Sequence, residues 1–257
     1  MRVVVWNVAN KARAFDALAS LRPDIALLNE AAPPPTETGI WRDETVGRDA
    51  KRRKWSAAVL TPHPFAEITD AQPQWRTSKR NVPFECSRPG SWVAAEVDVA
   101  AGETVTAVAL YGLLDELSDS SVHRSLSEIS PVLDDRRYRR LVLIGGDLNT
   151  GTQWPAGDYF GPRDGNVLAR FEALGLVDCL VAMRPAGRLE GCLCTHGDDC
   201  THTRTRLDPR RPHVAYQTDY LWASRLLAKR LRSCTALATD EWFAISDHAP
   251  ILAEFDV

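Results

Sequence analysis

Short runs of apolar residues alternate with polar segments along this chain, and most runs have the length of a buried strand. Apolar runs of about four to eight residues between turn residues are typical of strands buried on both faces. We predict strands at residues 3–6, 25–28, 55–60, 92–99, 105–111, 141–144, 176–177, 220–222 and 251–255. Gly102 lies between two of these strands and predicts a β-hairpin there.

Three segments carry apolar residues at helical spacing instead. Residues 11–21 place Ala14, Ala17, Leu18 and Leu21 on one face, and Pro23 follows as a stop signal. Residues 122–134 and 165–174 predict two further helices. The strands outnumber the helices, and the sequence shows no repeat or linker. We therefore predict one domain over residues 1–257, in which two β-sheets pack face to face with helices outside.

The composition narrows the class of protein. Hydrophobic residues make up 44% and charged residues 25% of the chain, as in globular proteins with a sizeable core, and the net charge is −3. A protein that coats nucleic acid is usually basic, so contacts to nucleic acid would come from local patches. The first apolar run is too short for a signal peptide or a membrane span. We expect a cytoplasmic protein without a membrane partner.

Polar residues follow or begin the predicted strands at several points. A single Asp or Asn in a turn usually makes only local hydrogen bonds. Functional side chains, however, are often placed on loops that a rigid scaffold holds. The coincidence of many such residues at strand ends therefore predicts a functional site composed of Asn7, Glu30, Tyr111, Asp147, Asn149, Asp219, Asp247 and His248.

Three of these residues offer hard oxygen ligands. Mg²⁺ binds carboxylates, amide oxygens and waters in preference to thiolates. Glu30, Asn7 and Asp247 together suit an ion of this kind. We therefore expect a magnesium-like cation at the predicted site.

The remaining polar residues suit hydrolysis of a phosphate ester. Asp147 can take a proton from water, and Asn149 can orient that water. His248 can stabilise the negative charge that grows on the phosphoryl group, and Asp219 can hold the imidazole in one orientation. The sequence thus predicts a metal-dependent site that activates a water molecule for attack on the phosphorus atom of the substrate.

The motifs that carry these residues resemble the endonuclease/exonuclease/phosphatase superfamily, which shares the DNase I fold. The resemblance covers nearly the whole chain, in the order Trp6-Asn7-Val8, Pro23-Asp24-Ile25, Asn29-Glu30, Trp55 to Leu60, Gly146-Asp147-Leu148-Asn149, Thr218-Asp219-Tyr220-Leu221 and Ser246-Asp247-His248-Ala249-Pro250-Ile251. It implies a four-layered α/β sandwich with two mainly antiparallel sheets. It also implies Mg²⁺ or Mn²⁺ held mainly by Glu30, and a catalytic group of Asp147, Asn149 and His248 with Asp219 beside it.

Two positions bear on the branch of this superfamily. Tyr111 resembles the tyrosine of exonuclease III-like and abasic-site endonucleases, whose hydroxyl contacts the phosphate. Those relatives usually follow the metal-binding glutamate with a Thr-Lys pair, whereas Glu30 is followed here by Ala31 and Ala32. The resemblance therefore indicates the superfamily and leaves the branch open.

Basic and aromatic residues near the motifs could bind the substrate. Lys51, Arg52 and Arg53 belong to a basic run before a strand, and Arg204 lies in a second basic group before Asp219. A phosphate backbone requires such side chains, although charge runs are commonly only solvated. Trp154 could stack on a base or pack within a loop. Both interpretations stay open.

Cysteine and histidine are concentrated in one short segment. Cys192, Cys194, His196, Cys200 and His202 offer five ligands, and a structural zinc ion needs four. The spacing is not that of a standard zinc finger. Free thiols, a disulfide, or a histidine that contacts the substrate are alternatives.

These observations lead to one functional hypothesis and one alternative. We expect a divalent-metal-dependent phosphodiesterase that hydrolyses nucleic acid, most simply a DNA endonuclease or exonuclease acting as a monomer without an obligate protein partner. The alternative is a phosphatase or phosphodiesterase for a lipid headgroup or a small phosphate ester. A noncatalytic binding module would be expected to lack Glu30, Asp147 or His248, and all three are present.

Overall fold

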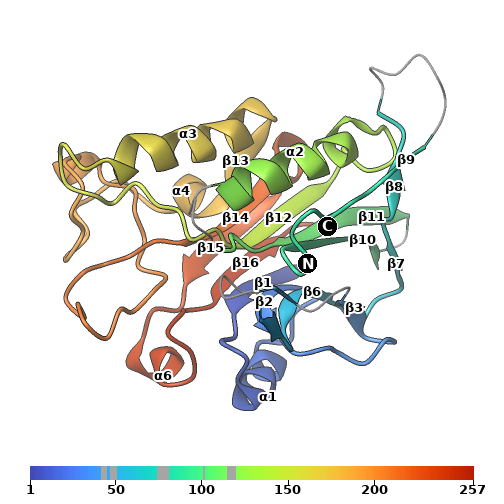
Figure 1. Cartoon of the computed structure of the whole chain (residues 1–257), viewed down its shortest axis with the longest axis horizontal. Coiled ribbons are helices and arrows are strands. Elements are labelled where there is room, and N and C mark those ends of the chain that lie inside the picture. Colours follow the sequence, from blue (N-terminus) through green and yellow to red (C-terminus); the bar gives the residue numbers. More distant parts are fainter. Residues whose placement is uncertain (42–44, 47–50, 74–80, 101, 115–119) are drawn as a thin grey trace.

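The computed structural model of the chain describes residues 1–41, 45–46, 51–73, 81–100, 102–114 and 120–257. Within them, two six-stranded sheets pack face to face (Figure 1). The first sheet has the order β15-β16-β1-β2-β6-β3, with bounds β1 Arg2–Asn7, β2 Ile25–Ala31, β3 Gly39–Trp41, β6 Ser56–Leu60, β15 Leu231–Ala236 and β16 Ile251–Phe255. The second has the order β13-β14-β12-β11-β10-β7, with bounds β7 Phe65–Glu67, β10 Trp92–Ala100, β11 Glu103–Leu110, β12 Val142–Asp147, β13 Leu176–Asp178 and β14 Asp219–Ser224.

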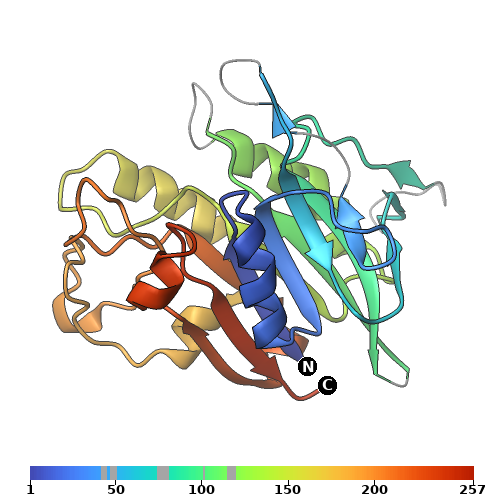
Figure 2. The same cartoon turned by 90° about the horizontal axis from the view of Figure 1, so that it is seen from below.

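Helices cover the outer faces of both sheets. Helix α1 (Ala12–Leu21) lies across the outside of the first sheet, as Figure 2 shows, and α2 (Ser120–Asp134) and α3 (Phe160–Ala173) cover the second. The shorter helices are α4 (Cys179–Met183), α5 (Arg225–Ala228), α6 (Asp240–Phe243) and a 3₁₀ turn η1 (Gly197–Asp199). Two small two-stranded sheets pair β4 (Thr45–Val46) with β5 (Arg52–Arg53) and β8 (Asp70–Ala71) with β9 (Val82–Pro83). The result is a four-layered α/β sandwich, which confirms the predicted fold class.

The central strands are apolar throughout because both of their faces are covered. Successive side chains of a strand point to opposite faces of its sheet. In β1, Val3 and Val5 enter the core between the two sheets, whereas Val4 and Trp6 pack toward α1. This double burial explains why the run reads as a continuous apolar segment rather than as an alternating one.

Most strand pairs are antiparallel, and two parallel pairs align the strands that lead to the predicted site. β1 pairs in parallel with β2, and β11 pairs in parallel with β12. The carboxyl ends of these four strands therefore lie at one end of the sandwich. β16 and β14 run antiparallel to β1 and β12, so their first residues lie at the same end.

The predicted elements differ from the observed ones mainly at the sheet edges and helix ends. The 92–99 and 105–111 strands form the expected hairpin. Helix α1 ends at Leu21 because Arg22 adopts a left-handed conformation with φ 47°, one residue before Pro23. Helix α3 begins at Phe160, five positions before the predicted start, and β15 was not predicted. Among the described residues, no helix is long and apolar enough to cross a membrane.

Candidate active site

The predicted functional residues converge at one end of the two sheets. Asn7 ends β1, Asp147 ends β12, and Asp219 begins β14. Asp147 and Asp219 are direct partners in the β12–β14 register, so the sheet itself holds the two acids side by side. Both carboxylates are buried, as is His248, which precedes β16.

Asp147 is fixed by a buried asparagine of the other sheet. The Asn29 Oδ1 atom accepts a hydrogen bond from the Asp147 backbone N–H at 2.5 Å, and the Asn29 amide donates to the Leu110 carbonyl at 3.2 Å. Gly146 permits this close approach, since a Cβ there would lie 1.9 Å from the Leu110 oxygen. The Gly-Asp motif is thus explained by backbone packing as well as by chemistry.

His248 lies between the two buried acids. Its Nδ1 lies 2.9 and 3.0 Å from the two Asp219 carboxylate oxygens, and its Nε2 lies 3.7 Å from Asp147 Oδ2. Burial acts to lower the pKa of His248, but the carboxylates of Asp219 and Asp147 outweigh it and raise that pKa to about 9. The imidazole is therefore cationic at neutral pH and faces Asp147 with one nitrogen.

The turn that carries His248 is held against β1. The Trp6 indole N–H donates to the His248 carbonyl at 2.8 Å, and the Ser246 hydroxyl donates to the Asn7 carbonyl at 2.7 Å. The Thr218 hydroxyl donates to Asp219 at 3.1 Å. Hydrogen bonds therefore anchor both ends of the His248–Asp219 pair.

Asp147 is the candidate general base. Burial raises its pKa to about 6, and the cationic His248 beside it limits that rise. Asn149 donates its backbone N–H to Asp147 Oδ1 at 2.9 Å and its amide to Oδ2 at 3.3 Å. Asn149 adopts φ 48°, a left-handed conformation that asparagine tolerates better than most residues. At neutral pH the Asp147 carboxylate is ionised and oriented.

Glu30 enters the site through an irregularity in β2. The β2–β6 register shifts between Leu28 and Ala31, and Glu30 lies in this bulge with φ 50°. A bulge redirects a side chain that would otherwise follow the strand alternation. The Tyr111 hydroxyl and the Asn7 amide both donate to Glu30 Oε1, at 2.8 and 3.3 Å.

This arrangement fits a divalent cation at Glu30. Both hydrogen bonds fall on one carboxylate oxygen, and among the described residues Oε2 receives none, so it is free to bind an ion. Burial and the Glu30 charge raise the pKa of the Tyr111 hydroxyl well above its ordinary value, which keeps it a donor. The Asn7 amide nitrogen also donates to Asp147 at 3.0 Å, while its oxygen accepts from the Ala9 N–H. The predicted third ligand, Asp247, is half-exposed beside His248.

Arg206 joins the site although the sequence did not single it out. Its backbone forms an isolated bridge with His248, and its charge acts to lower the pKa of Asp147 and of Tyr111. A guanidinium at this place suits a phosphate ligand. In the sequence, Arg206 is one member of an arginine-rich group, and no local signal separates it from Arg204.

The predicted substrate-binding residues fall into two groups. Lys51 and Arg52 are exposed and Arg53 is half-buried, and this basic run leads directly to Trp55. The Trp55 ring contacts the Tyr111 ring edge-on, with centroids 5.7 Å apart. The basic run therefore ends at a residue that contacts Tyr111.

Trp154 and Arg204 are instead used in packing. The Trp154 ring lies 5.8 Å from the Phe160 ring and 5.9 Å from the Tyr216 ring. The Arg204 guanidinium lies over the Phe243 ring at 5.2 Å and donates to the Pro212 carbonyl. Both side chains support loops near the site.

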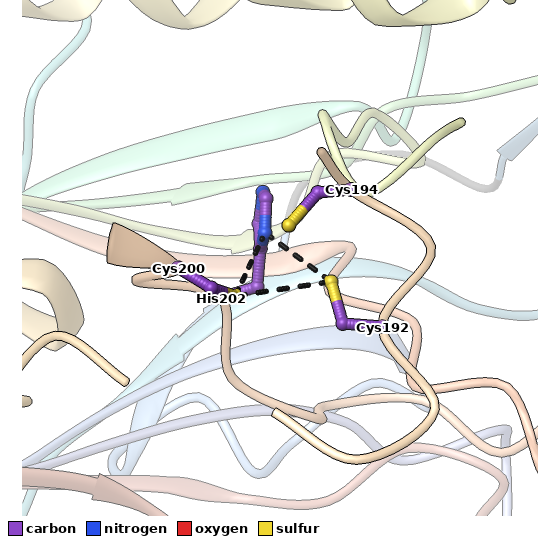
Figure 3. Close-up of side chains that lie close together, drawn as sticks. All are labelled: Cys192, Cys194, Cys200 and His202. Atoms are coloured by element: carbon purple, nitrogen blue, oxygen red, sulfur yellow. Dashed lines mark hydrogen bonds between the residues drawn. The ribbon is translucent and has the colours of Figure 1, made fainter. Parts of the chain in front are cut away.

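The cysteine- and histidine-rich segment forms a second cluster, separate from the acids. Cys192, Cys194, Cys200 and His202 place one ligand atom each within 4.8 Å of all the others (Figure 3). The fifth predicted residue, His196, is exposed and outside this group, although its ring centroid lies 6.1 Å from that of His202.

The sheets, their order of strands and the site at the strand ends define a DNase I-like α/β sandwich. Solved structures with this architecture cover essentially the whole chain. A 3'-5' exonuclease from Neisseria meningitidis is similar over 100% of both chains, with 18% identity and a TM-score of 0.64. An AP endonuclease from Archaeoglobus fulgidus is similar over 100% of both chains, with 17% identity and a TM-score of 0.63.

A third similar structure contains bound DNA. It is a 3' phosphatase from Neisseria bound to a product DNA hairpin, similar over 100% of both chains with 18% identity and a TM-score of 0.65. No family model matches the sequence, and no curated protein matches it in sequence. The likeness at this identity establishes the DNase I-like fold.

Proposed function

We propose that the protein is a divalent-metal-dependent phosphodiesterase that hydrolyses nucleic acid, with DNA as the favoured substrate. The observation that carries the proposal is the buried Asp147–His248–Asp219 group beside the Glu30 carboxylate. An ionised general base, a cationic imidazole and a carboxylate with a free oxygen are the groups that hydrolysis of a phosphodiester needs.

The chain's own residues account for the movement of the proton. Asp147, with a pKa of about 6, is ionised at neutral pH and can take a proton from a water molecule aimed at phosphorus. The two hydrogen bonds from Asn149 hold the carboxylate in one orientation. The cationic His248 stabilises the charge that accumulates on the phosphoryl oxygens, and Asp219 keeps it protonated and oriented.

Glu30 would hold the divalent cation, with Asp247 and Asn7 nearby. When bound, Mg²⁺ or Mn²⁺ would supply positive charge to a phosphoryl oxygen. Tyr111 and Asn7 orient the Glu30 carboxylate through hydrogen bonds to its Oε1. Arg206 adds a fixed positive charge on the side of Asp147.

Two observations support a nucleic-acid substrate. The basic run that includes Lys51, Arg52 and Arg53 leads to Trp55, which contacts Tyr111, so it could follow a backbone that leaves the site. Similar structures include an exonuclease, an AP endonuclease and a phosphatase bound to a DNA hairpin.

A substrate panel tests the proposal. The purified protein would be incubated with Mg²⁺ or Mn²⁺ and single-stranded DNA, duplex DNA, abasic duplex, 3'-phosphorylated DNA, RNA or a phosphoinositide. We expect cleavage of at least one DNA substrate, lost on chelation and lost in Asp147→Asn. Preference for the phosphoinositide or a sugar phosphate over every oligonucleotide would establish the alternative function.

The salt dependence of binding tests the basic run. Replacing Arg52, Arg53 and Lys54 with Ala should flatten the log–log salt dependence, because each neutralised phosphate contributes about −0.9 to that slope on duplex DNA. A matched control removes Arg136, Arg139 and Arg140, three exposed arginines that precede β12 and so lie at its opposite end from Asp147. A slope that changes equally in both variants would argue against binding along the basic run.

A further inference from the structure

A long connection outside both sheets leads into the candidate active site. Between α4, which ends at Met183, and β14, which begins at Asp219, the described chain forms no other helix or strand than the short 3₁₀ turn η1, apart from isolated bridges at Arg206 (Figure 1). This connection has few apolar residues to order it, yet it continues directly into Asp219. The Cys/His cluster lies in its middle.

The spacing of the four side chains matches a tetrahedral metal site. Cys192 Sγ and Cys200 Sγ lie 3.9 Å apart, and each lies close to His202 Nδ1, at 3.4 and 3.5 Å respectively. Around a zinc ion with Zn–S bonds of about 2.3 Å and a Zn–N bond of about 2.0 Å, two sulfurs are about 3.8 Å apart and a sulfur and a nitrogen about 3.5 Å apart. The sulfur of Cys194 belongs to the same group, within 4.8 Å of the other three ligand atoms (Figure 3).

A disulfide explains the same group less well. A disulfide would require two sulfurs about 2.0 Å apart and would leave the third cysteine and the histidine without a role. All three cysteines are free thiols, and the histidine nitrogen is nearly equidistant from two of them. Four ligand atoms arranged around one point are typical of a metal site.

The surroundings of His202 select the nitrogen that would bind. The Nε2 atom lies 2.8 Å from the Thr152 hydroxyl oxygen. When Nε2–H donates to that oxygen, Nδ1 carries the free lone pair and faces the sulfurs. A histidine that binds a metal commonly donates its other N–H to an oxygen in this way.

We propose that Cys192, Cys194, Cys200 and His202 bind one structural zinc ion, with His202 using Nδ1, and that His196 is not a ligand. Four protein ligands complete a tetrahedral shell and leave no open position, so this ion would stabilise structure rather than act on a substrate.

The zinc ion would anchor two loops of the active site. Three residues after His202, the Thr205 hydroxyl accepts the Asp219 N–H at 3.2 Å, and the Thr205 carbonyl accepts the Ala249 N–H at 2.7 Å. Thr205 therefore ties the chain that follows His202 to β14 and to the residue after His248. On its other side, the His202–Thr152 hydrogen bond reaches the loop that carries Asn149.

Metal analysis of tag-free protein, purified without chelator, tests the site without reference to activity. We expect one zinc ion per chain in the wild type, its loss in Cys192→Ser and Cys200→Ser, and its retention in His196→Ala and Cys86→Ser. Glu30→Ala should also retain it, which separates this ion from a cation at the acids. Less than about 0.2 zinc per chain in the wild type, or full retention in both cysteine variants, would overturn the proposal.

X-ray absorption of the wild-type protein identifies the ligands even if the cysteine variants fail to fold. We expect a shell of three sulfurs at about 2.3 Å and one nitrogen at about 2.0 Å. A shell of nitrogen and oxygen alone would overturn the assignment. Hydrogen exchange of residues 203–207 should accelerate by at least tenfold when zinc is removed, and unchanged exchange there would overturn the anchoring role.

Discussion

The charge on Asp219 offers the sharpest test of the proposed chemistry. Asp219→Asn keeps the size of the side chain and one oxygen that can accept from His248 Nδ1, at a position where the present distances are 2.9 and 3.0 Å. It removes the negative charge that lies nearest to the imidazole. Because Asp219 is fully buried, water cannot replace that charge. The substitution therefore isolates the electrostatic contribution of Asp219 from its contribution to packing.

The expected loss of rate depends on pH. In the wild type the pKa of His248 is about 9, so the imidazole is about 90% protonated at about pH 8. Without the Asp219 charge, burial is opposed only by the charges of Asp147 and Asp247, so the pKa of His248 should fall. A fall to the ordinary value of about 6.5 leaves about 3% of the imidazole protonated at that pH. The variant would then be slower by about 30-fold at about pH 8, and by less than about twofold at about pH 6. His248 stabilises the transition state only while its imidazole is protonated. That contribution is therefore lost as the pH rises through the pKa of His248, and this happens at a lower pH in the variant than in the wild type.

The assay is steady-state cleavage of the best DNA substrate at saturating metal ion, followed from about pH 6 to about pH 9 for both proteins. Thr218→Val is the matched control, since it removes the hydrogen bond to Asp219 without changing a charge. We expect that control to stay within a few-fold of the wild type at every pH. A ratio of wild-type to Asp219→Asn rates that does not change with pH would refute the role of Asp219 in keeping His248 protonated.

Two further predictions concern the metal site and the support of Asp147. Glu30→Gln should raise the Mg²⁺ concentration for half-maximal activity by about tenfold or more, because a neutral amide is a weaker ligand than a carboxylate. Titration of activity with Mg²⁺ measures this concentration. An unchanged midpoint would show that Glu30 does not bind the ion. Asn29→Ala should lower the free energy of unfolding by about 2 to 6 kcal/mol, since the buried Asp147 N–H and Leu110 carbonyl both lose their partner. Urea unfolding checks the second value, and a loss below about 1 kcal/mol would show that these backbone groups are satisfied in another way.

The interior strands could be predicted from sequence because burial on both faces leaves an unmistakable apolar run. β1 and β12 are examples, since alternate residues of each enter different cores. β15, with the sequence Leu-Arg-Ser-Cys-Thr-Ala, lies at a sheet edge, where exposed positions are polar and the run is lost. The start of α3 was missed because Gly161, Pro162 and Gly165 fall in its first turns and resemble a loop.

The candidate site was partly predictable for a related reason. Asp147 ends an apolar strand and Asp219 begins one, so their positions at strand ends could be inferred without a structure. Asn29 was overlooked as a site residue because its role depends on Leu110 and Asp147, which belong to the other sheet. The spacing of the cysteines likewise could not separate His202 from His196, since that choice depends on how the loop folds.

The site is assembled across the interface between the two sheets, and this has a consequence for residues far from the chemistry. One sheet supplies Glu30 and the turn with His248, and the other supplies Asp147 and Asp219. The distance between these halves is set by the core behind them. At Gly145, a single added methyl group would lie 2.7 Å from the Val5 side chain of the facing sheet. Interior substitutions that leave every polar residue intact can therefore alter catalytic geometry, so that the volume of the apolar core acts as a determinant of turnover.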